Sequence, residues 1–482
     1  MKFVIKLFPE IIVKSRPVRK NFIKQLKVNI KRILKGVDDG FKVRGDWDRV
    51  DVIPSCNHPD LIQAMQEKLQ HTPGIEWVLL CDDYHFNDRA HLRDIVMQQL
   101  QDDFNHHSFC VRVKRTGQHD FRSIDLEREL GSEILKAFPS SQVKLKKPDI
   151  ELAIEVVKDR LFMVRSKHRG IGGYPLGMQD ACLSLISGGF DSTVSSYQMM
   201  RRGVRTHFCF FNLGGSAHEV GVKQVAHYLW SKYGASHRVL FTTVPFEGVV
   251  EELLTKVDNA YMGVLLKRMM LRAASAIAEH KTLPALVTGE AIAQVSSQTM
   301  KNLNAIDGAV EDLVLRPLIS MHKQEIIEIA QQIGTAEFAA NMPEYCGVIS
   351  DKPTIAAKKE RVAIEEERFD FAVLEQAIAN QVTIPIDKVL EGEKSYTEVD
   401  IVSAPALEDV ILDIRHPQEH ENKPLFLTNN EILHIPFYKL EREFKQLDTD
   451  KSYLLYCDKG VMSELQAQHL IQNGFDNVKV YR

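Results

Sequence analysis

The chain has 482 residues, 44% of them hydrophobic and 26% charged, and its formal net charge at pH 7 is -4. This length predicts two to four domains, and the globular composition excludes a disordered chain, a fibrous repeat and a coiled coil. Since no apolar run approaches the roughly 20 residues of a membrane helix and the N-terminus lacks an apolar signal core, we expect a cytoplasmic protein without a membrane partner.

The first 50 residues are strongly basic, with 14 Lys and Arg against 5 Asp and Glu. Residues 2–8 predict a short strand, and residues 17–35 predict a helix, because apolar residues recur at spacing four between Pro17 and Gly36. The helix cations that lie off the apolar stripe include Lys20, Lys24, Lys27 and Lys31. The alternative is an ordinary solvated face, but Glu10 is the one acid against eleven bases up to residue 36, so we favour contact with nucleic acid.

Residues 76–167 continue the alternation of strands and helices. The predicted elements are strands at 76–80 and 108–115, helices at 88–103 and 125–137, and a hairpin of 151–157 with 161–166. In the strand at 108–115, residues 109–115 alternate in a way that predicts one cationic face, formed by Arg112, Lys114 and Arg115. This module has few candidate catalytic residues, which favours a binding platform. The glycine-rich residues 167–177 predict a turn-rich connector.

The remainder of the chain predicts two further α/β regions. Residues 178–385 alternate strands and helices and predict a doubly wound parallel sheet. Residues 386–404 predict a linker. Residues 405–482 predict a last small unit, with strands at 409–414 and 452–456 and a helix at 463–473. The linker and the last unit, residues 386–482, together hold 11 Lys and Arg residues against 18 Asp and Glu residues, so this end of the chain is acidic.

The sequence SGGFDS at residues 187–192 is the strongest functional signal. It follows an apolar strand at 182–186 and begins a helix at Ser192, which is the setting of a phosphate-binding loop. It is not a Walker A loop, because no Lys-Ser or Lys-Thr pair follows at the required spacing. The motif resembles the PP-loop of ATP pyrophosphatases, which cleave ATP between the α and β phosphates and adenylate a carbonyl oxygen. The alternative is a plain glycine turn.

Cys457 is a second signal, at the end of a predicted strand and before a predicted helix. Helix N-terminal N–H groups would point at its sulfur and stabilise a thiolate or persulfide anion. The stretch at 413–419 resembles the D-x-R-x-P-x-E sequence of rhodaneses, and residues 473–478 resemble their closing turn. The loop lacks the arginine common in rhodaneses, and a buried structural cysteine is the alternative.

The other cysteines give weaker signals. Seven cysteines, no two closer than 25 positions, predict reduced thiols and neither a disulfide framework nor a CxxC metal site. Cys346 follows Pro343, Glu344 and Tyr345 in a loop, and alone it is an incidental thiol. It gains interest because a persulfide carrier needs a second thiol to release its product. The 18 histidines show no metal-ligand spacing, so we expect no resident metal site.

An ATP-dependent carbonyl activator and a persulfide carrier together amount to sulfur insertion. The whole chain resembles the tRNA uracil 4-sulfurtransferase (4-thiouridine synthetase) family, in its long form with a C-terminal rhodanese domain. The motifs that carry the resemblance are GGYPLG at 172–177, SGGFDS at 187–192, TGE at 288–290, QVSSQT at 294–299, LRPL at 315–318, EYC at 344–346 and the Cys457 loop.

The resemblance implies a multidomain α/β fold. Residues 1–75 would be a ferredoxin-like domain, 76–167 a THUMP domain that grips tRNA, 178–385 the PP-loop adenylating domain and 405–482 a rhodanese-like domain. The implied ATP-binding residues are Leu185, Ile186, Ser187, Gly188, Gly189, Asp191, Ser192, Lys267, Gly289 and Gln298. Asp191 would organise the pyrophosphate through Mg²⁺, and Lys323 would place a positive charge over the reacting phosphate or uridine.

Three of these residues can also be judged without the resemblance. Lys267 alone fits a solvated helix cation, and Lys323 alone fits an ion pair with Glu325 or Glu328. Gly289 follows an apolar strand at 285–287, where a doubly wound sheet brings ligands close to the backbone.

The resemblance also implies the chemistry and partners. Cys457 would carry a persulfide from a cysteine desulfurase, and Cys346 would form the resolving disulfide with it. The substrate would be the uridine at position eight of tRNA, converted to 4-thiouridine with release of AMP and pyrophosphate. A second role would be sulfur donation to the thiamine thiazole through a sulfur-carrier protein. A tRNA-binding module with a vestigial ATPase is the rival hypothesis, and a homodimer is compatible with either.

Overall fold

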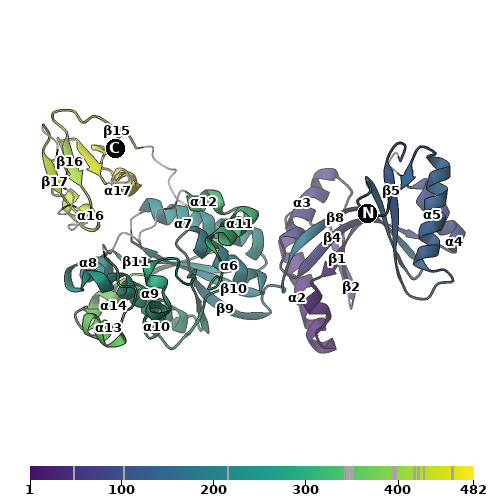
Figure 1. Ribbon diagram of the computed structural model, residues 1–482, viewed down its shortest axis with the longest axis horizontal. Helices are drawn as coiled ribbons and strands as arrows, with labels where there is room; N and C mark the ends of the chain where they lie inside the picture. Colours follow the sequence, from purple (N-terminus) through teal and green to yellow (C-terminus); the bar gives the residue numbers. More distant parts are fainter. Residues whose placement is uncertain are drawn as a thin grey trace. The chain divides into compact units, whose positions relative to one another are not determined.

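The computed structural model describes residues 1–46, 49–100, 104–213, 216–340, 342, 352–391, 399–415, 420, 424–426, 429–457 and 461–482. They form two compact units, one of Met1–Met178 with Arg201–Gly203 and one of Gln179–Met200 with Val204–Arg482 (Figure 1). The first unit contains an eight-stranded sheet, and the second contains a six-stranded and a five-stranded sheet. The predicted multidomain α/β fold is therefore confirmed. Within the described residues, no helix combines the length and the apolar character needed to cross a membrane.

The first part of the N-terminal unit has the strand and helix order of a ferredoxin-like fold. Its elements are β1 (Lys2–Leu7), α1 (Pro9–Ile12), α2 (Arg16–Leu34), β2 (Lys42–Asp46), β3 (Arg49–Ile53), α3 (Pro59–Gln70) and β4 (Ile75–His85). The apolar stripe of α2, with Leu26 and Ile30 fully buried, packs on Phe3 and Ile5 of β1. The helix begins and ends within one residue of its predicted bounds. Its cationic face is left toward solvent.

The second part of this unit extends the same sheet. Its elements are α4 (Arg89–Gln98), β5 (Ser108–Thr116), α5 (Ser123–Ala137), β6 (Gln142–Val143), β7 (Ile150–Val157) and β8 (Arg160–Gly172). Because β4 pairs with both β1 and β8, the strand order is β2-β3-β1-β4-β8-β7-β5-β6. The predicted connector is wrong for residues 167–172, which lie in β8. Gly170 permits this pairing, since a Cβ there would lie 2.3 Å from the Ile75 carbonyl oxygen.

The two faces of β5 differ in environment. Val111 and Val113 are buried against α4 and α5 in the core of this part of the unit. Arg112 and Lys114 alternate with them and are exposed on the opposite face. The prediction that Arg115 shares their face is wrong, because strand side chains alternate with period two. Its guanidinium instead donates to the Gly117 carbonyl oxygen at 3.3 Å.

The six-stranded sheet is a doubly wound α/β layer, as predicted. Its strands are β9 (Gln179–Leu185), β10 (Val204–Asn212), β11 (Leu240–Pro245), β12 (Ala285–Val287), β13 (Leu313–Leu315) and β14 (Val382–Pro385). The order is β13-β12-β9-β10-β11-β14, in which five strands are parallel and β14 is an antiparallel edge. Chain order reverses at β9, which has β10 on one side and β12 on the other. Ligands bind at the carboxyl ends of strands at such a switch point.

Helices and short turns connect these strands, and a last short turn follows β14 (Figure 1). They are α6 (Phe190–Arg201), α7 (Ser216–Leu229), the π-helical η1 (Trp230–Gly234), α8 (Glu247–Lys256), η2 (Asn259–Tyr261), α9 (Met262–His280), η3 (Ser296–Gln298), α10 (Met300–Asp307), α11 (Lys323–Ile333), α12 (Ala336–Ala340), α13 (Lys359–Glu366), α14 (Phe371–Ala379) and η4 (Ile386–Lys388). Helix α9 is buried along most of its length and supplies much of the core, with Leu265 and Met269 fully inaccessible.

The C-terminal sheet is parallel and has a hydrophobic core of its own. Its elements are β15 (Ile401–Val402), β16 (Val410–Asp413), β17 (Ile432–His434), α16 (Phe437–Phe444), β18 (Tyr453–Tyr456), α17 (Val461–Gln472) and β19 (Val478–Tyr481), in the strand order β15-β19-β18-β16-β17. Leu412 and Leu455 are fully buried at its centre. Cys457 follows β18 directly.

Candidate active site

The SGGFDS loop joins β9 to α6 at the switch point of the six-stranded sheet. Gly188 has a φ of +83°, which favours glycine. The Ser187 backbone N–H donates to Ser192 Oγ at 3.1 Å, and that hydroxyl donates to the Gly189 carbonyl oxygen at 3.2 Å. A Cβ on Gly189 would meet its nearest heavy atom, Ser187 Oγ, only at 3.8 Å. The backbone at Gly189 is therefore open to a ligand, as a phosphate loop requires.

A cavity of about 350 Å³ lies over this loop. Nine of the ten residues predicted to bind ATP line it: Leu185, Ile186, Ser187, Gly189, Asp191, Ser192, Lys267, Gly289 and Gln298. The tenth, Gly188, lies against Met342, which itself lines the cavity, and a Cβ there would be 3.0 Å from the Met342 sulfur. Residues from four distant parts of the sequence thus surround one space, which has the size of a small-molecule site.

Gly289 is required for a different reason from the one predicted. A Cβ at this position would lie 2.7 Å from the carbonyl carbon of Asp191 and 2.8 Å from the nitrogen of Ser192. The glycine therefore lets the end of β12 approach the first turn of α6. It lines the cavity as expected, but close packing of backbone on backbone already explains the residue type.

Asp191 and Lys323 form an ion pair beside the phosphate loop. Lys323 Nζ lies 3.0 Å from each carboxylate oxygen of Asp191, and Gln294 Nε2 donates to the same carboxylate at 2.8 Å. The alternative partner Glu325 instead accepts from the His322 backbone N–H at 2.7 Å and caps α11. The Lys323 side chain is 39% exposed, so its ammonium can turn to an incoming phosphate.

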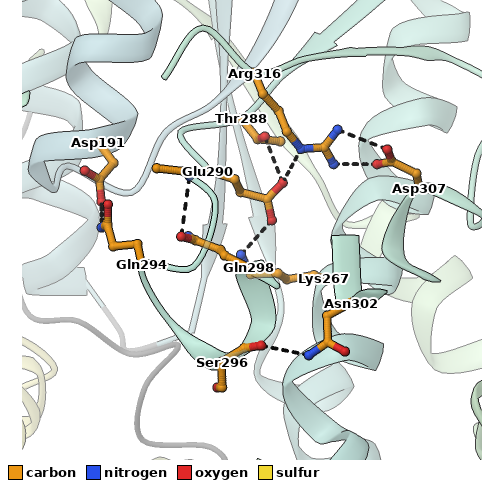
Figure 2. Close-up of polar contacts among 11 residues, drawn as sticks. Asp191, Lys267, Thr288, Glu290, Gln294, Ser296, Gln298, Asn302, Asp307 and Arg316 are labelled. Atoms are coloured by element: carbon orange, nitrogen blue, oxygen red, sulfur yellow. Dashed lines mark hydrogen bonds and ion pairs between the residues drawn. The ribbon is translucent and has the colours of Figure 1, made fainter. Parts of the chain in front are cut away.

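Lys267 belongs to a buried chain of charges (Figure 2). Glu290 accepts from Lys267 Nζ at 2.7 Å and from Arg316 Nε at 2.8 Å, and Arg316 also pairs with Asp307. Burial alone would raise the pKa of Glu290, but the charges and hydrogen bonds of Lys267 and Arg316 outweigh it and hold that pKa at about 2. The solvated-cation alternative for Lys267 is therefore wrong: its ammonium is fixed at the cavity wall.

His218 of α7 lines the cavity and contacts the phosphate loop. Its Nε2 lies 3.1 Å from the Ser187 carbonyl oxygen, which makes that nitrogen the N–H donor, and its ring packs edge-on against Phe210. Burial lowers the pKa of His218 to about 4, so the ring is neutral at neutral pH. The sequence analysis missed His218, Glu290, Gln294 and Arg316 as site residues. Glu290 and Arg316 lie within the quoted TGE and LRPL motifs, whereas the sequence carries no local signal for His218.

Cys457 has a polar setting at the start of α17. Its half-buried sulfur accepts from the Ser463 backbone N–H at 3.4 Å and lies 3.4 Å from the Ser463 hydroxyl. This contact supports the expected role of helix N–H groups. At the end of β16, the strand that pairs with β18, the fully buried Asp413 accepts a hydrogen bond from Arg415 Nη2 at 2.6 Å. Cys346 lies outside the described residues, so its pairing with Cys457 stays a prediction.

The predicted RNA-binding cations lie on α2 and β5 of the N-terminal unit. Lys20, Lys24 and Lys31 are exposed, whereas Lys27 is half-buried and donates to the Gly45 carbonyl oxygen at 3.1 Å. Lys114 is exposed, and Arg112, also exposed, donates to the Leu145 carbonyl oxygen at 2.6 Å. These contacts leave Lys20, Lys24, Lys31 and Lys114 as the ammonium groups of this set best placed to meet phosphates.

Family models match most of the chain. The model described as "Thiamine biosynthesis protein (ThiI)" matches residues 177–371, and those described as "ThiI ferredoxin-like domain", "THUMP domain" and "Rhodanese-like domain" match 2–78, 89–164 and 400–482.

Curated relatives and a solved structure are also similar. The chain is 50% identical over 483 residues to the tRNA sulfurtransferase of Shewanella sp. (strain W3-18-1) and 51% identical over 482 residues to that of Pseudomonas fluorescens (strain Pf0-1), with 100% of both chains covered in each case. The crystal structure of a 4-thiouridine synthetase–RNA complex with bound ATP matches at a TM-score of 0.67 and 25% identity, covering 80% of this chain and 99% of that one.

Proposed function

This chain belongs to the tRNA sulfurtransferase family, and on that premise we propose that it uses ATP to replace O4 of the uridine at position eight of tRNA with sulfur. The product is 4-thiouridine. The observation that carries the proposal is the cavity at the switch point, where the open Gly189 backbone and the Asp191–Lys323 pair converge. This arrangement suits a nucleoside triphosphate whose phosphates lie on the loop and at the N-terminus of α6.

The first step activates the uridine. Its O4 attacks the α-phosphorus of ATP, an O–P bond forms, and pyrophosphate leaves. Lys323 turns from Asp191 to the phosphates and stabilises the charge that develops there. The Asp191 carboxylate would hold a Mg²⁺ ion, which would supply positive charge for the leaving pyrophosphate. Lys267, held by Glu290, contributes a fixed positive charge at the cavity wall.

The second step inserts sulfur. The terminal sulfur of a Cys457 persulfide attacks C4 of the adenylated uridine, and AMP leaves. The Cys346 thiolate then attacks the Cys457 sulfur and breaks the S–S bond, so that thiouridine is released and a Cys346–Cys457 disulfide forms. A dithiol reductant supplies two electrons to reset the enzyme. The Ser463 backbone N–H donates to Cys457 Sγ at 3.4 Å and holds that sulfur near the start of α17.

The proposed partners follow from this cycle. A cysteine desulfurase supplies the persulfide, and tRNA lies across the exposed cations of α2 and β5, with Lys24 and Lys114 among its phosphate contacts. Sulfur donation to the thiamine thiazole through a sulfur-carrier protein is a second proposed role, suggested by the description of the matching family model. That role would need Cys457 but not the ATP cavity, so an Asp191→Ala chain should keep it and lose thiouridine formation.

The rival is a tRNA-binding module with a vestigial ATPase, and one experiment separates the two. Nucleosides of tRNA from cells that lack this gene are analysed by mass spectrometry, with the wild-type chain, Asp191→Ala or Cys457→Ala supplied in trans. We expect 4-thiouridine to return with the wild type alone. Normal thiouridine levels in cells that carry Cys457→Ala would remove the carrier role of this cysteine. Normal levels in cells without any copy of the gene would contradict the proposal. With purified Cys346→Ala, one turnover should survive and further turnovers should stop.

A further inference from the structure

Asn302, in the first turn of α10, is fully buried although its side chain is an amide. Its Nδ2 donates to the backbone carbonyl oxygens of Ser296 and Thr354, at 2.7 Å each, and its Oδ1 accepts from the Ala357 backbone N–H at 2.8 Å. Figure 2 shows the contact with Ser296. Two donors and the acceptor of the amide are therefore all used. The flipped amide would place Oδ1 against two carbonyl oxygens, so the orientation is fixed.

The backbone groups that Asn302 joins belong to two walls of the cavity. Ser296 lies in the short turn η3 together with Gln298, and both residues line the cavity. Thr354 also lines the cavity and comes from a separate segment, 52 positions away from Asn302 along the chain. Asn302 itself does not line the cavity. It acts on a ligand only through the two segments that it holds.

Further contacts make this connection stiff. Thr299, which caps α10, donates its hydroxyl to the Ile355 carbonyl oxygen at 2.8 Å and accepts from the Asn302 backbone N–H at 3.3 Å. The Thr354 backbone N–H donates to the carbonyl oxygen of Ala260, another cavity residue, at 2.9 Å. The wall around Thr354 is therefore fixed on one side by Ala260 and on the other by Asn302.

We propose that Asn302 is a positioning residue for the nucleotide, which sets the turn of Gln298 and the wall of Thr354 at the spacing that ATP requires. The inference rests on the proposed function in taking ATP as the ligand. A site whose walls are already in place loses less conformational entropy when it binds. The buried Asn302 amide, which is hydrogen-bonded to three backbone groups, keeps these walls in place and does not itself contact the ligand.

Asn29 gives a matched control, because it is also a fully buried asparagine on a helix. Its Nδ2 donates to the Leu176 carbonyl oxygen at 2.9 Å, and its Oδ1 accepts from Gln25 Nε2 at 2.8 Å. Asn29 belongs to the N-terminal unit and does not line the cavity. If buried amides matter only for stability, Asn29→Ala and Asn302→Ala should lower the melting temperature and leave the ATP affinity of the folded protein unchanged.

The test measures the ATP dissociation constant of the full chain by calorimetry, well below the melting temperature of each variant. We expect Asn302→Ala to weaken ATP binding by about tenfold or more, which corresponds to one buried hydrogen bond or more. Asn302→Asp keeps the acceptor for Ala357 but turns a carboxylate toward two carbonyl oxygens, so it should weaken binding at least as much. Asn29→Ala should stay within about twofold of the wild type.

Hydrogen exchange provides a second readout. In the wild type, ATP should slow exchange in peptides that cover residues 296–298 and 354–357. In folded Asn302→Ser, which retains a single hydroxyl donor at this position, ATP should no longer slow exchange in 354–357. Wild-type affinity in a folded Asn302→Ala chain, or unchanged protection of 354–357 in Asn302→Ser, overturns the inference. A wild-type chain that does not bind ATP overturns the proposed function itself, which is a distinguishable result.

Discussion

Replacement of Glu290 by glutamine tests the buried charges of the cavity wall. The Glu290 side chain is 8% exposed and lies between Lys267 and Arg316, whose side chains are 17% and 10% exposed. Its pKa of about 2 lies below the ordinary value of 4.5, and a depression of this size corresponds to about 3 kcal/mol of stability at neutral pH. Glu290→Gln removes the charge and leaves two cations without their shared partner. We therefore expect a loss of up to about 3 kcal/mol from this domain.

The stability difference between wild type and Glu290→Gln should also change with pH in a defined direction. Because the folded-state pKa of Glu290 is depressed, its contribution is complete above the unfolded-state pKa and is lost as pH falls through the folded-state pKa. The difference between wild type and Glu290→Gln should therefore shrink by about 1 kcal/mol between pH 7 and pH 4. Opening free energies from hydrogen exchange of peptides in α9 and β12 measure this in one domain of a multidomain chain.

A control separates the buried acid from an exposed one. Glu279→Gln changes an exposed acid on the same helix as Lys267 and should alter the opening free energy by no more than about 0.5 kcal/mol. Equal effects of the two substitutions, or a difference at Glu290 that grows as the pH falls, would refute the reasoning.

Three other substitutions test the phosphate loop, the end of α11 and the RNA surface. Gly189→Ala adds a methyl that meets no protein atom closer than 3.8 Å, so the chain should fold normally. Calorimetry should then show ATP binding that is weaker by about tenfold or more, because the methyl occupies the space of the phosphates. The control Gly131→Ala, on α5, should bind ATP normally. Gly334→Ala places a Cβ 2.1 Å from the Tyr228 hydroxyl at a φ of +83°, so melting curves should show a loss of about 1–3 kcal/mol; an unchanged melting temperature would contradict the packing described. Lys24→Ala should weaken tRNA binding and reduce the slope of log affinity against log salt by about one; an unchanged slope would remove this residue from the RNA surface.

Local patterns in the sequence predicted the features that depend on neighbouring residues. The bounds of α2 followed from the spacing of its apolar residues between Pro17 and Gly36, and the phosphate loop followed from residues 187–192, where strand, turn and helix are contiguous. Eight of the ten predicted nucleotide residues line one cavity because they lie at the end of β9 or in the segments that follow β9 and β12, and the carboxyl ends of parallel strands share one sheet edge. Lys267 reaches the same cavity from α9.

The features that sequence analysis missed depend on contacts between residues that are far apart in the sequence. Gly170 was taken for a turn signal, although it permits the pairing of β8 with β4. Glu290 and Lys267 are 23 positions apart, and their contact arises only when β12 and α9 pack together. Asn302 carries no motif at all, because its three partners are backbone groups that any residue type would provide. The domain boundaries, the roles of the site residues and the Cys346–Cys457 pairing stay predictions.

The central claim is that ATP cleavage and sulfur insertion are coupled on one tRNA nucleotide. The most direct measurement uses purified full chain, tRNA, ATP and a cysteine desulfurase with cysteine, and counts AMP and 4-thiouridine in the same reaction. The account predicts one AMP for each thiouridine, no thiouridine with Cys457→Ala, and neither product with Asp191→Ala. Thiouridine formed without ATP, or AMP released at the same rate without tRNA, would contradict it.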